Sequence, residues 1–155
     1  MGQQQLLLLV LGIVIVGLAV VVGIQAFSEN QQKANMDALV NDSVRIASDL
    51  QAWSLKPQAF GGPAPTPTDP WRTASFDDLG YKTDVDGGRC PSGMYGNLNG
   101  CFQLGGGVIW TFGYNGDKPN NNFVRVDVTG TSPADITTQT NADGNMPGPP
   151  TTGGN

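Results

Sequence analysis

The chain of 155 residues contains no histidine, and this absence removes several kinds of catalytic and metal site. Histidine is the commonest general base in enzymes and a member of most nucleophile triads. It is also, with cysteine, the usual ligand of structural zinc. Only two cysteines are present, so there is no second cysteine pair for such a site. No other catalytic arrangement stands out, and we expect a protein that is not an enzyme and holds no metal or cofactor.

Positive charge is also scarce. Eight lysines and arginines against thirteen acidic residues give a formal net charge of −5 and a pI near 4.3. A nucleic-acid interface needs a basic patch to replace the counterions on phosphate, so we expect no nucleic-acid partner. No basic residue precedes Lys33. Because secretory signals and N-terminal anchors normally carry a basic flank, we expect that a basic leader has been removed and that Met1 is the mature N-terminus.

A long apolar run follows the first five residues. Residues 6–24 contain no charge and no proline. About 20 apolar residues are enough for a helix to cross a bilayer. A helix that is hydrophobic on every side must be buried in lipid or in protein. We therefore predict that residues 1–27 form an apolar helix half that anchors the chain in a membrane.

The helical pattern continues where the apolar run ends. Residues 28–56 contain neither proline nor glycine, and their apolar residues recur at helical spacing. This stripe predicts an amphipathic helix half whose core residues are Leu39, Ile46, Leu50 and Trp53. Pro57 ends the pattern, and residues 57–74 are a connection rich in proline and glycine.

The rest of the chain predicts one small β-domain over residues 75–132. Ser75 to Tyr81 has the residues of a capped helical turn. Two runs with apolar residues at alternate positions predict an antiparallel hairpin around a loop at residues 115–122, and residues 102–104 suit a third strand. The fold class is therefore α+β, a long helix packed on a small antiparallel sheet. We expect the helix stripe to contact the strand residues Trp110, Phe112, Val124 and Val126.

Cys90 and Cys101 predict a disulfide, because an anchored chain exposes this region to an oxidising compartment. Closing so short a loop contributes somewhat under about 3 kcal/mol. Two buried thiols are the alternative. Residues 133–155 are poor in apolar residues and rich in Thr, Asn, Gly and Pro, so this tail either covers the sheet or is exposed.

Two further patterns have a functional and a plain interpretation. Asp84 and Asp86 have the alternate spacing of a calcium loop, but the later glutamate of an EF-hand is missing, and a solvated turn is favoured. The tail threonines are candidates for O-glycosylation. Asn41 begins an N-glycosylation triplet, which lies within the predicted amphipathic helix.

The order of these elements resembles the type IV pilins and the related pseudopilins. The resemblance covers the uncharged N-terminus, the two helix halves over residues 1–55, the Phe76 to Tyr81 turn, the sheet and the disulfide. It implies that a prepilin peptidase cuts after a leader glycine and methylates Met1. The family usually has glutamate at the fifth position, where this chain has Gln5, and the usual mid-helix proline is absent.

What the resemblance implies is a structural subunit of an extracellular filament at the cell surface, anchored in the inner membrane before the pilus assembly machinery extracts it. Copies then polymerise through their apolar helices. A membrane-anchored ectodomain, or a minor pilin or pseudopilin of a secretion system, is the alternative. The expected assembly residues are Gln5, Leu6, Leu9, Ile13, Val16, Val20 and Ile24. Adhesion, motility, DNA uptake, secretion and electron transfer are not distinguished.

Overall fold

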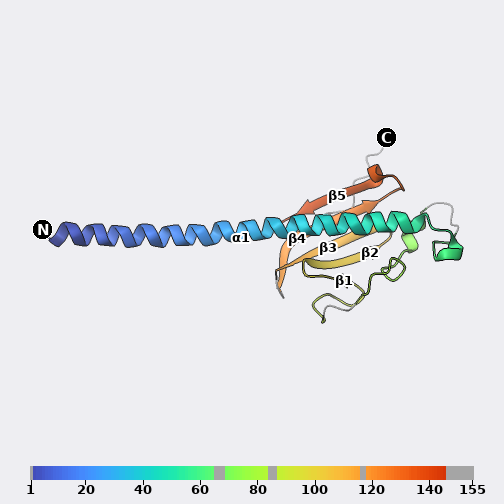
Figure 1. The fold of residues 1–155 in the computed structure, drawn as a ribbon, viewed down its shortest axis with the longest axis horizontal. Coiled ribbons are helices and arrows are strands. Elements are labelled where there is room, and N and C mark those ends of the chain that lie inside the picture. Colours follow the sequence, from blue (N-terminus) through green and yellow to red (C-terminus); the bar gives the residue numbers. More distant parts are fainter. Residues whose placement is uncertain (1, 65–68, 84–86, 116–117, 146–155) are drawn as a thin grey trace. The chain divides into compact units, whose positions relative to one another are not determined.

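The computed structural model describes residues 2–64, 69–83, 87–115 and 118–145, and its fold is α+β (Figure 1). One long helix, α1 (Gly2–Ser54), precedes a five-stranded antiparallel sheet in which each strand pairs with the next along the chain. The strands are β1 (Tyr95–Gly96), β2 (Gly100–Gly105), β3 (Val108–Asn115), β4 (Lys118–Val128) and β5 (Ile136–Asn141). The described residues also form the short 3₁₀ helices η1 (Gln58–Phe60), η2 (Pro70–Thr73) and η3 (Pro133–Asp135).

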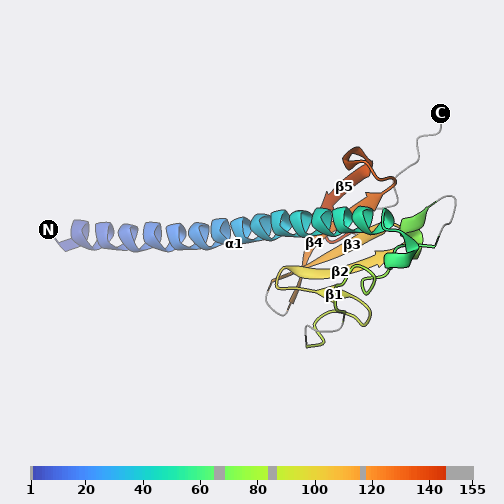
Figure 2. The same ribbon diagram turned by 45° about the vertical axis from the view of Figure 1, so that its right-hand side comes forward.

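The chain divides into two compact units, Met1–Ala34 and Asn35–Asn155. The boundary therefore falls about two helical turns beyond the predicted change from apolar to amphipathic helix at residue 28. Within the second unit, the C-terminal part of α1 lies across one face of the sheet, with β1 and β5 at the two edges (Figures 1 and 2). The helix ends at Ser54, two residues before the predicted end, since the residues preceding Pro57 are pushed out of helical geometry.

The predicted core residues of the helix are all buried in the second unit. Leu39 and Leu50 are fully buried, Ile46 is 2% exposed and Trp53 is 5% exposed. They share one apolar cluster with Phe102 of β2, Ile109 of β3 and three valines of β4. Full burial of a side chain of this size contributes about 1.5–3 kcal/mol. The apolar stripe on α1 thus covers the apolar face of the sheet and completes the core.

The prediction that Trp110 and Phe112 face the helix is wrong. In the β3–β4 register, Thr111 is opposite Val124, whereas Trp110 is opposite Arg125. Residues directly opposite each other share a face, so Trp110 lies on the side of the sheet away from α1. There its ring stacks on the Arg125 guanidinium, 4.5 Å from the ring centroid, and Arg125 also forms a buried ion pair with Asp127 at 2.7 Å.

Small residues on the other face explain why α1 packs there. Gly100 of β2 is paired with Gly113 of β3. A Cβ at either glycine would lie 2.7 or 2.8 Å from a methyl carbon of Leu39, closer than real contacts allow. Beside this pair, the hydroxyls of Ser43 and Thr111 are hydrogen-bonded at 2.7 Å. The paired glycines therefore form a notch for Leu39, whereas Trp110 and Phe112 lie on the opposite face of β3.

Two predicted boundaries of the sheet also differ from the structure. The polar run at residues 115–122 was expected to be a loop, yet β3 extends to Asn115 and β4 begins at Lys118. The sheet continues beyond residue 132, because β5 pairs with β4 from Asn141 to Ile136. In contrast, the Ser75 turn forms as predicted: the Ser75 backbone N–H and hydroxyl both donate to the Asp78 carboxylate, at 2.9 and 2.7 Å.

Candidate assembly surface and the helix–sheet junction

Residues 2–34 of α1 form a helix whose surface is exposed over its whole length. Its most apolar 18-residue window has a mean hydropathy of 3.2, and none of that window is buried within the chain. The helix is long and apolar enough to cross a membrane, and a long apolar N-terminal helix is compatible with membrane anchoring. Such a surface is unfavourable in water, so its environment in the working protein is lipid or protein.

From Leu6 to Ile24, the predicted assembly residues follow one another at intervals of three or four, which places them on one face of this helix. The large side chains among them are between 55% and 67% exposed. That range covers Leu6, Leu9, Ile13, Val16, Val20 and Ile24. Nothing in the described chain packs on this face, and it is therefore available to a second molecule or to lipid.

Small residues and one amide border the apolar face. Gly12, Ala19 and Gly23 are separated by seven and four residues and form a narrow strip along the helix. Small residues let two helices approach closely within a membrane. Gln5 is exposed near the start of the helix and provides a neutral amide where the resemblance leads one to expect a carboxylate. Met1, the predicted modified N-terminus, lies outside the described residues.

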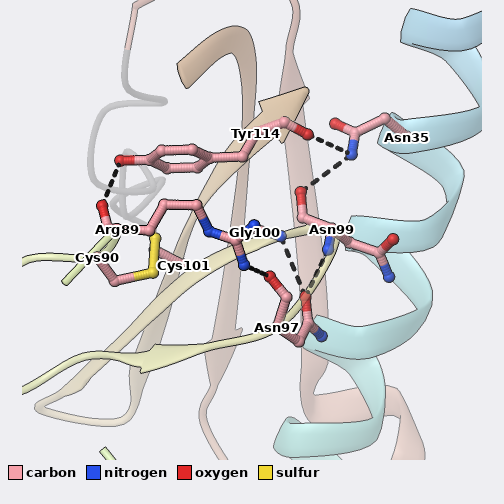
Figure 3. Close-up of a disulfide and its surroundings, with 8 residues drawn as sticks. All are labelled: Asn35, Arg89, Cys90, Asn97, Asn99, Gly100, Cys101 and Tyr114. Carbon is pink, nitrogen blue, oxygen red and sulfur yellow. Dashed lines mark hydrogen bonds between the residues drawn. A yellow bond between two sulfur atoms is a disulfide. The ribbon is translucent and has the colours of Figure 1, made fainter. Parts of the chain in front are cut away.

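A network of asparagines fastens α1 to the sheet at the beginning of the second unit (Figure 3). The Asn35 amide donates to the carbonyls of Asn99 and Tyr114 at 2.9 and 3.2 Å. Its carbonyl accepts from the side chains of Asn120 and Asn122 at 2.8 and 3.1 Å. Buried polar groups must be paired in this way, because an unpaired one costs about 1–3 kcal/mol.

The same network explains why residues 120–122 are strand and not loop. The side-chain amides of Asn120 and Asn122 both donate to Asn35, which lies 85 residues before Asn120 in the chain. About two turns further along α1, Asp42 accepts hydrogen bonds from the amides of Asn97 and Asn99 at 2.8 and 2.9 Å. Sequence reasoning missed this junction, since nothing in a run of asparagines indicates a partner so distant in the chain.

The disulfide joins Cys90 to Cys101, with 5.6 Å between the two Cα atoms (Figure 3). Cys101 is fully buried in β2, opposite Phe112. Around it, the Tyr114 hydroxyl donates to the Arg89 carbonyl at 3.2 Å, and the Arg89 guanidinium donates to the Asn97 carbonyl. The bridge therefore fixes the segment before β1 to strand β2, next to the edge of the sheet. No cysteine is free.

Tyr81 connects the turn after Ser75 to the amphipathic part of α1. Its hydroxyl donates to the Asp49 carboxylate. Burial, followed by this hydrogen bond and the negative charge of Asp49, raises the pKa of Tyr81 to about 12. The ring also contacts Tyr95, with 4.9 Å between centroids. The phenol is therefore a neutral donor throughout the physiological pH range.

Asp84 and Asp86, the candidate calcium ligands, lie outside the described residues. Among the residues that are described, no group of three or more His, Cys, Asp or Glu side chains has the geometry to hold a metal ion.

Comparison with known proteins gave no match to a family model, to a curated protein sequence or to a solved structure. The functional interpretation therefore depends on the residues and contacts of this chain.

Proposed function

We propose that this chain is a structural subunit of an extracellular filament of the type IV pilus kind, and that it polymerises through its N-terminal apolar helix. The observation that carries the proposal is the exposed helix over residues 2–34, whose residues 6–24 are apolar and which is attached to a folded α+β unit. Outside a membrane, the best solvent for such a helix is other copies of the same helix. The α+β layout and the disulfide are consistent with a pilin-like subunit.

In this proposal the subunit passes through two environments. Before assembly, the helix lies in the inner membrane and the β-domain lies outside it. The prepilin peptidase and the pilus assembly machinery then process and extract the chain, and the helices of many copies bundle along the filament axis. Head-to-tail contacts that do not close into a ring produce a helical polymer. The role is structural, with no enzymatic step, cofactor or nucleic acid.

In the filament, Gln5 makes an uncharged contact with a neighbouring subunit. In the resembling family, a glutamate pairs with the N-terminal amine of a neighbouring subunit. Gln5 accepts a hydrogen bond from the same group through its amide oxygen, without the charge. A neutral acceptor binds less strongly than a carboxylate, so more of the assembly energy comes from packing of the apolar face.

A shearing experiment distinguishes a filament subunit from a membrane-anchored ectodomain. Cells that produce the chain are sheared and the cell-free material is pelleted, imaged by electron microscopy and identified by mass spectrometry. A filament subunit is recovered in the pelleted fibres. If the chain is found only in the membrane fraction and dissolves only in detergent, it is an anchored ectodomain and the proposal is wrong.

A further inference from the structure

A groove of about 470 Å³ runs beside the amphipathic part of α1. On one side it is bounded by residues of the helix and on the other by the turn that Tyr81 closes. Trp53, which is almost fully buried, also lines it. Its polar lining includes Arg45, Asp49, Lys56, Tyr81 and Lys82.

Basic side chains are concentrated at this groove, although the chain has only eight lysines and arginines. Three of the eight basic side chains line it: Arg45, Lys56 and Lys82. Within the described part of the chain, none of the three enters an ion pair. Arg72 and Arg125 differ in this respect, because they pair with Asp69 and Asp127 at 3.7 and 2.7 Å.

The single carboxylate among the lining residues is already engaged. Asp49 accepts the hydrogen bond of the Tyr81 hydroxyl. The lining residues therefore present three positive charges against one negative charge that is partly satisfied. An acidic group entering the groove meets unpaired cations, with an apolar ring beneath them.

A second copy of this chain has the complementary charge. The net charge of the whole chain is −5, although the groove itself is positive. Asp37, Asp77 and Asp143 are exposed, and in the described residues no basic side chain pairs with any of them. In a filament, neighbouring copies are held side by side, which raises the local concentration of these carboxylates at each groove.

We propose that the groove lined by Arg45, Lys56 and Lys82 receives an acidic group of a neighbouring copy of this chain, and that this contact joins the β-domains in the polymer. The proposal rests on the filament function. It adds an electrostatic contact between β-domains to the apolar contact between helices. Exposed charge pairs are screened over about 8 Å at physiological ionic strength, so this contact weakens as salt is added.

The test is the salt resistance of filaments made from the full-length chain. Sheared filaments are incubated in rising NaCl and the fraction that still pellets is measured. Lys82→Glu is compared with Lys118→Glu, which makes the same change in net charge at another exposed lysine. We expect Lys82→Glu filaments to dissociate at an NaCl concentration about twofold lower than native filaments, because repulsion replaces attraction in the groove. Lys118→Glu filaments should resemble the native ones.

A second variant and a charge swap complete the experiment. Lys56→Glu should reproduce the effect of Lys82→Glu, and thermal unfolding of each detergent-solubilised variant checks that the β-domain is intact.

Recovery of salt resistance when Lys82→Glu is combined with Asp37→Lys, Asp77→Lys or Asp143→Lys supports the proposal and identifies the partner. If Lys56→Glu, Lys82→Glu and Lys118→Glu all give native salt resistance, the inference is overturned while the filament function stands. Absence of filaments from the native chain overturns the filament function itself.

Discussion

Leu39 shows how single residues decide which face of the sheet the helix covers. Its two methyl groups lie over the paired glycines Gly100 and Gly113, where any larger residue would collide with them. Ser43, one turn further along, finds a hydroxyl partner in Thr111. These small residues therefore allow α1 to approach the sheet closely at Leu39, and substitutions at the two glycines would displace the helix.

Leu50 is the residue whose truncation most simply tests the helix–sheet core. It is fully buried in the cluster, so Leu50→Ala removes buried apolar surface and leaves a cavity. We expect the free energy of unfolding to fall by about 2–5 kcal/mol. Chemical denaturation of the detergent-solubilised full chain measures it. Leu98→Ala is the control, because Leu98 is 87% exposed and its truncation should change stability by less than about 0.5 kcal/mol. Equal effects at the two positions would contradict this packing.

The raised pKa of Tyr81 predicts that the free energy of unfolding falls at alkaline pH. Folding raises the pKa of Tyr81 from 10.0 to about 12, so the folded state holds the phenol proton more tightly than the unfolded state. The resulting stabilisation is complete below pH 10 and is lost as the pH rises towards 12. Tyr81→Phe should lack this component and be less stable at neutral pH by about 0.5–1.5 kcal/mol, the net value of a hydrogen bond.

Denaturation curves of the native chain and of Tyr81→Phe, recorded from neutral pH to pH 12, test this. The gap in unfolding free energy should narrow above pH 10. Other alkaline groups are common to both proteins and cancel in the comparison. A gap that stays constant with pH would show that the Asp49 hydrogen bond does not shift the titration of the phenol.

At the scale of elements, the disulfide joins the irregular segment before β1 to strand β2. Its residues are separated by 11 positions, and Cys101 is fully buried. Replacing both cysteines by alanine should reduce the free energy of unfolding by about 2–3 kcal/mol, mainly by releasing the unfolded chain from a closed loop. The helical circular dichroism signal should change little, because the bridge does not contact α1.

Peptide mapping under non-reducing conditions checks the bridge in the native chain. The peptides containing Cys90 and Cys101 should be found linked, and the link should disappear on reduction. Two free thiols in the native protein would contradict the structure, and unchanged stability in the double alanine variant would contradict the role given to the bridge.

The sequence predicts the elements better than their contacts. Absence of proline and glycine from 28 to 56 predicts the helix, and its apolar spacing predicts the buried residues from Leu39 to Trp53. Alternation predicts β3 and β4 but not which face is covered, since both faces of β3 contain apolar residues. The large rings of Trp110 and Phe112 suggested a core, whereas close approach of α1 favours the smaller face.

Strand β5 and the ends of the hairpin escaped prediction for a related reason. The β5 sequence is mostly threonine, glutamine and asparagine, which reads as a loop until its pairing with β4 is known. Residues 120 and 122 are polar because their amides bind Asn35. In both places the structure depends on a pairing partner elsewhere in the chain: β4 for β5, and Asn35 for residues 120 and 122. The local sequence pattern does not indicate either partner.

At the scale of the whole molecule, the exposed apolar helix is the feature that requires partners. Val16 lies in its middle and is 63% exposed in the single chain. Val16→Asp places a carboxylate where neither lipid nor neighbouring helices solvate it, and burying an unpaired charge is expensive. We expect no filaments from this variant, although residues 35–155 should unfold at the native temperature.

Gln5→Glu and Val16→Ile are the matched controls. Val16→Ile retains the apolar surface and should assemble. Gln5→Glu adds a charge-assisted hydrogen bond to the amine of a neighbour, which is stronger than a neutral one, so assembly should be equal or better. Electron microscopy of sheared material measures all three variants. Loss of filaments with Gln5→Glu would place that position in an apolar contact.

The most direct measurement of the central claim is a cryo-electron microscopy reconstruction of sheared filaments at a resolution that shows side chains. The account predicts that residues 6–24 of each subunit pack against the same stretch of several neighbours in the filament centre, with the β-domains on the outside. A filament whose centre is built from β-domains, or one that does not contain this chain, would contradict it.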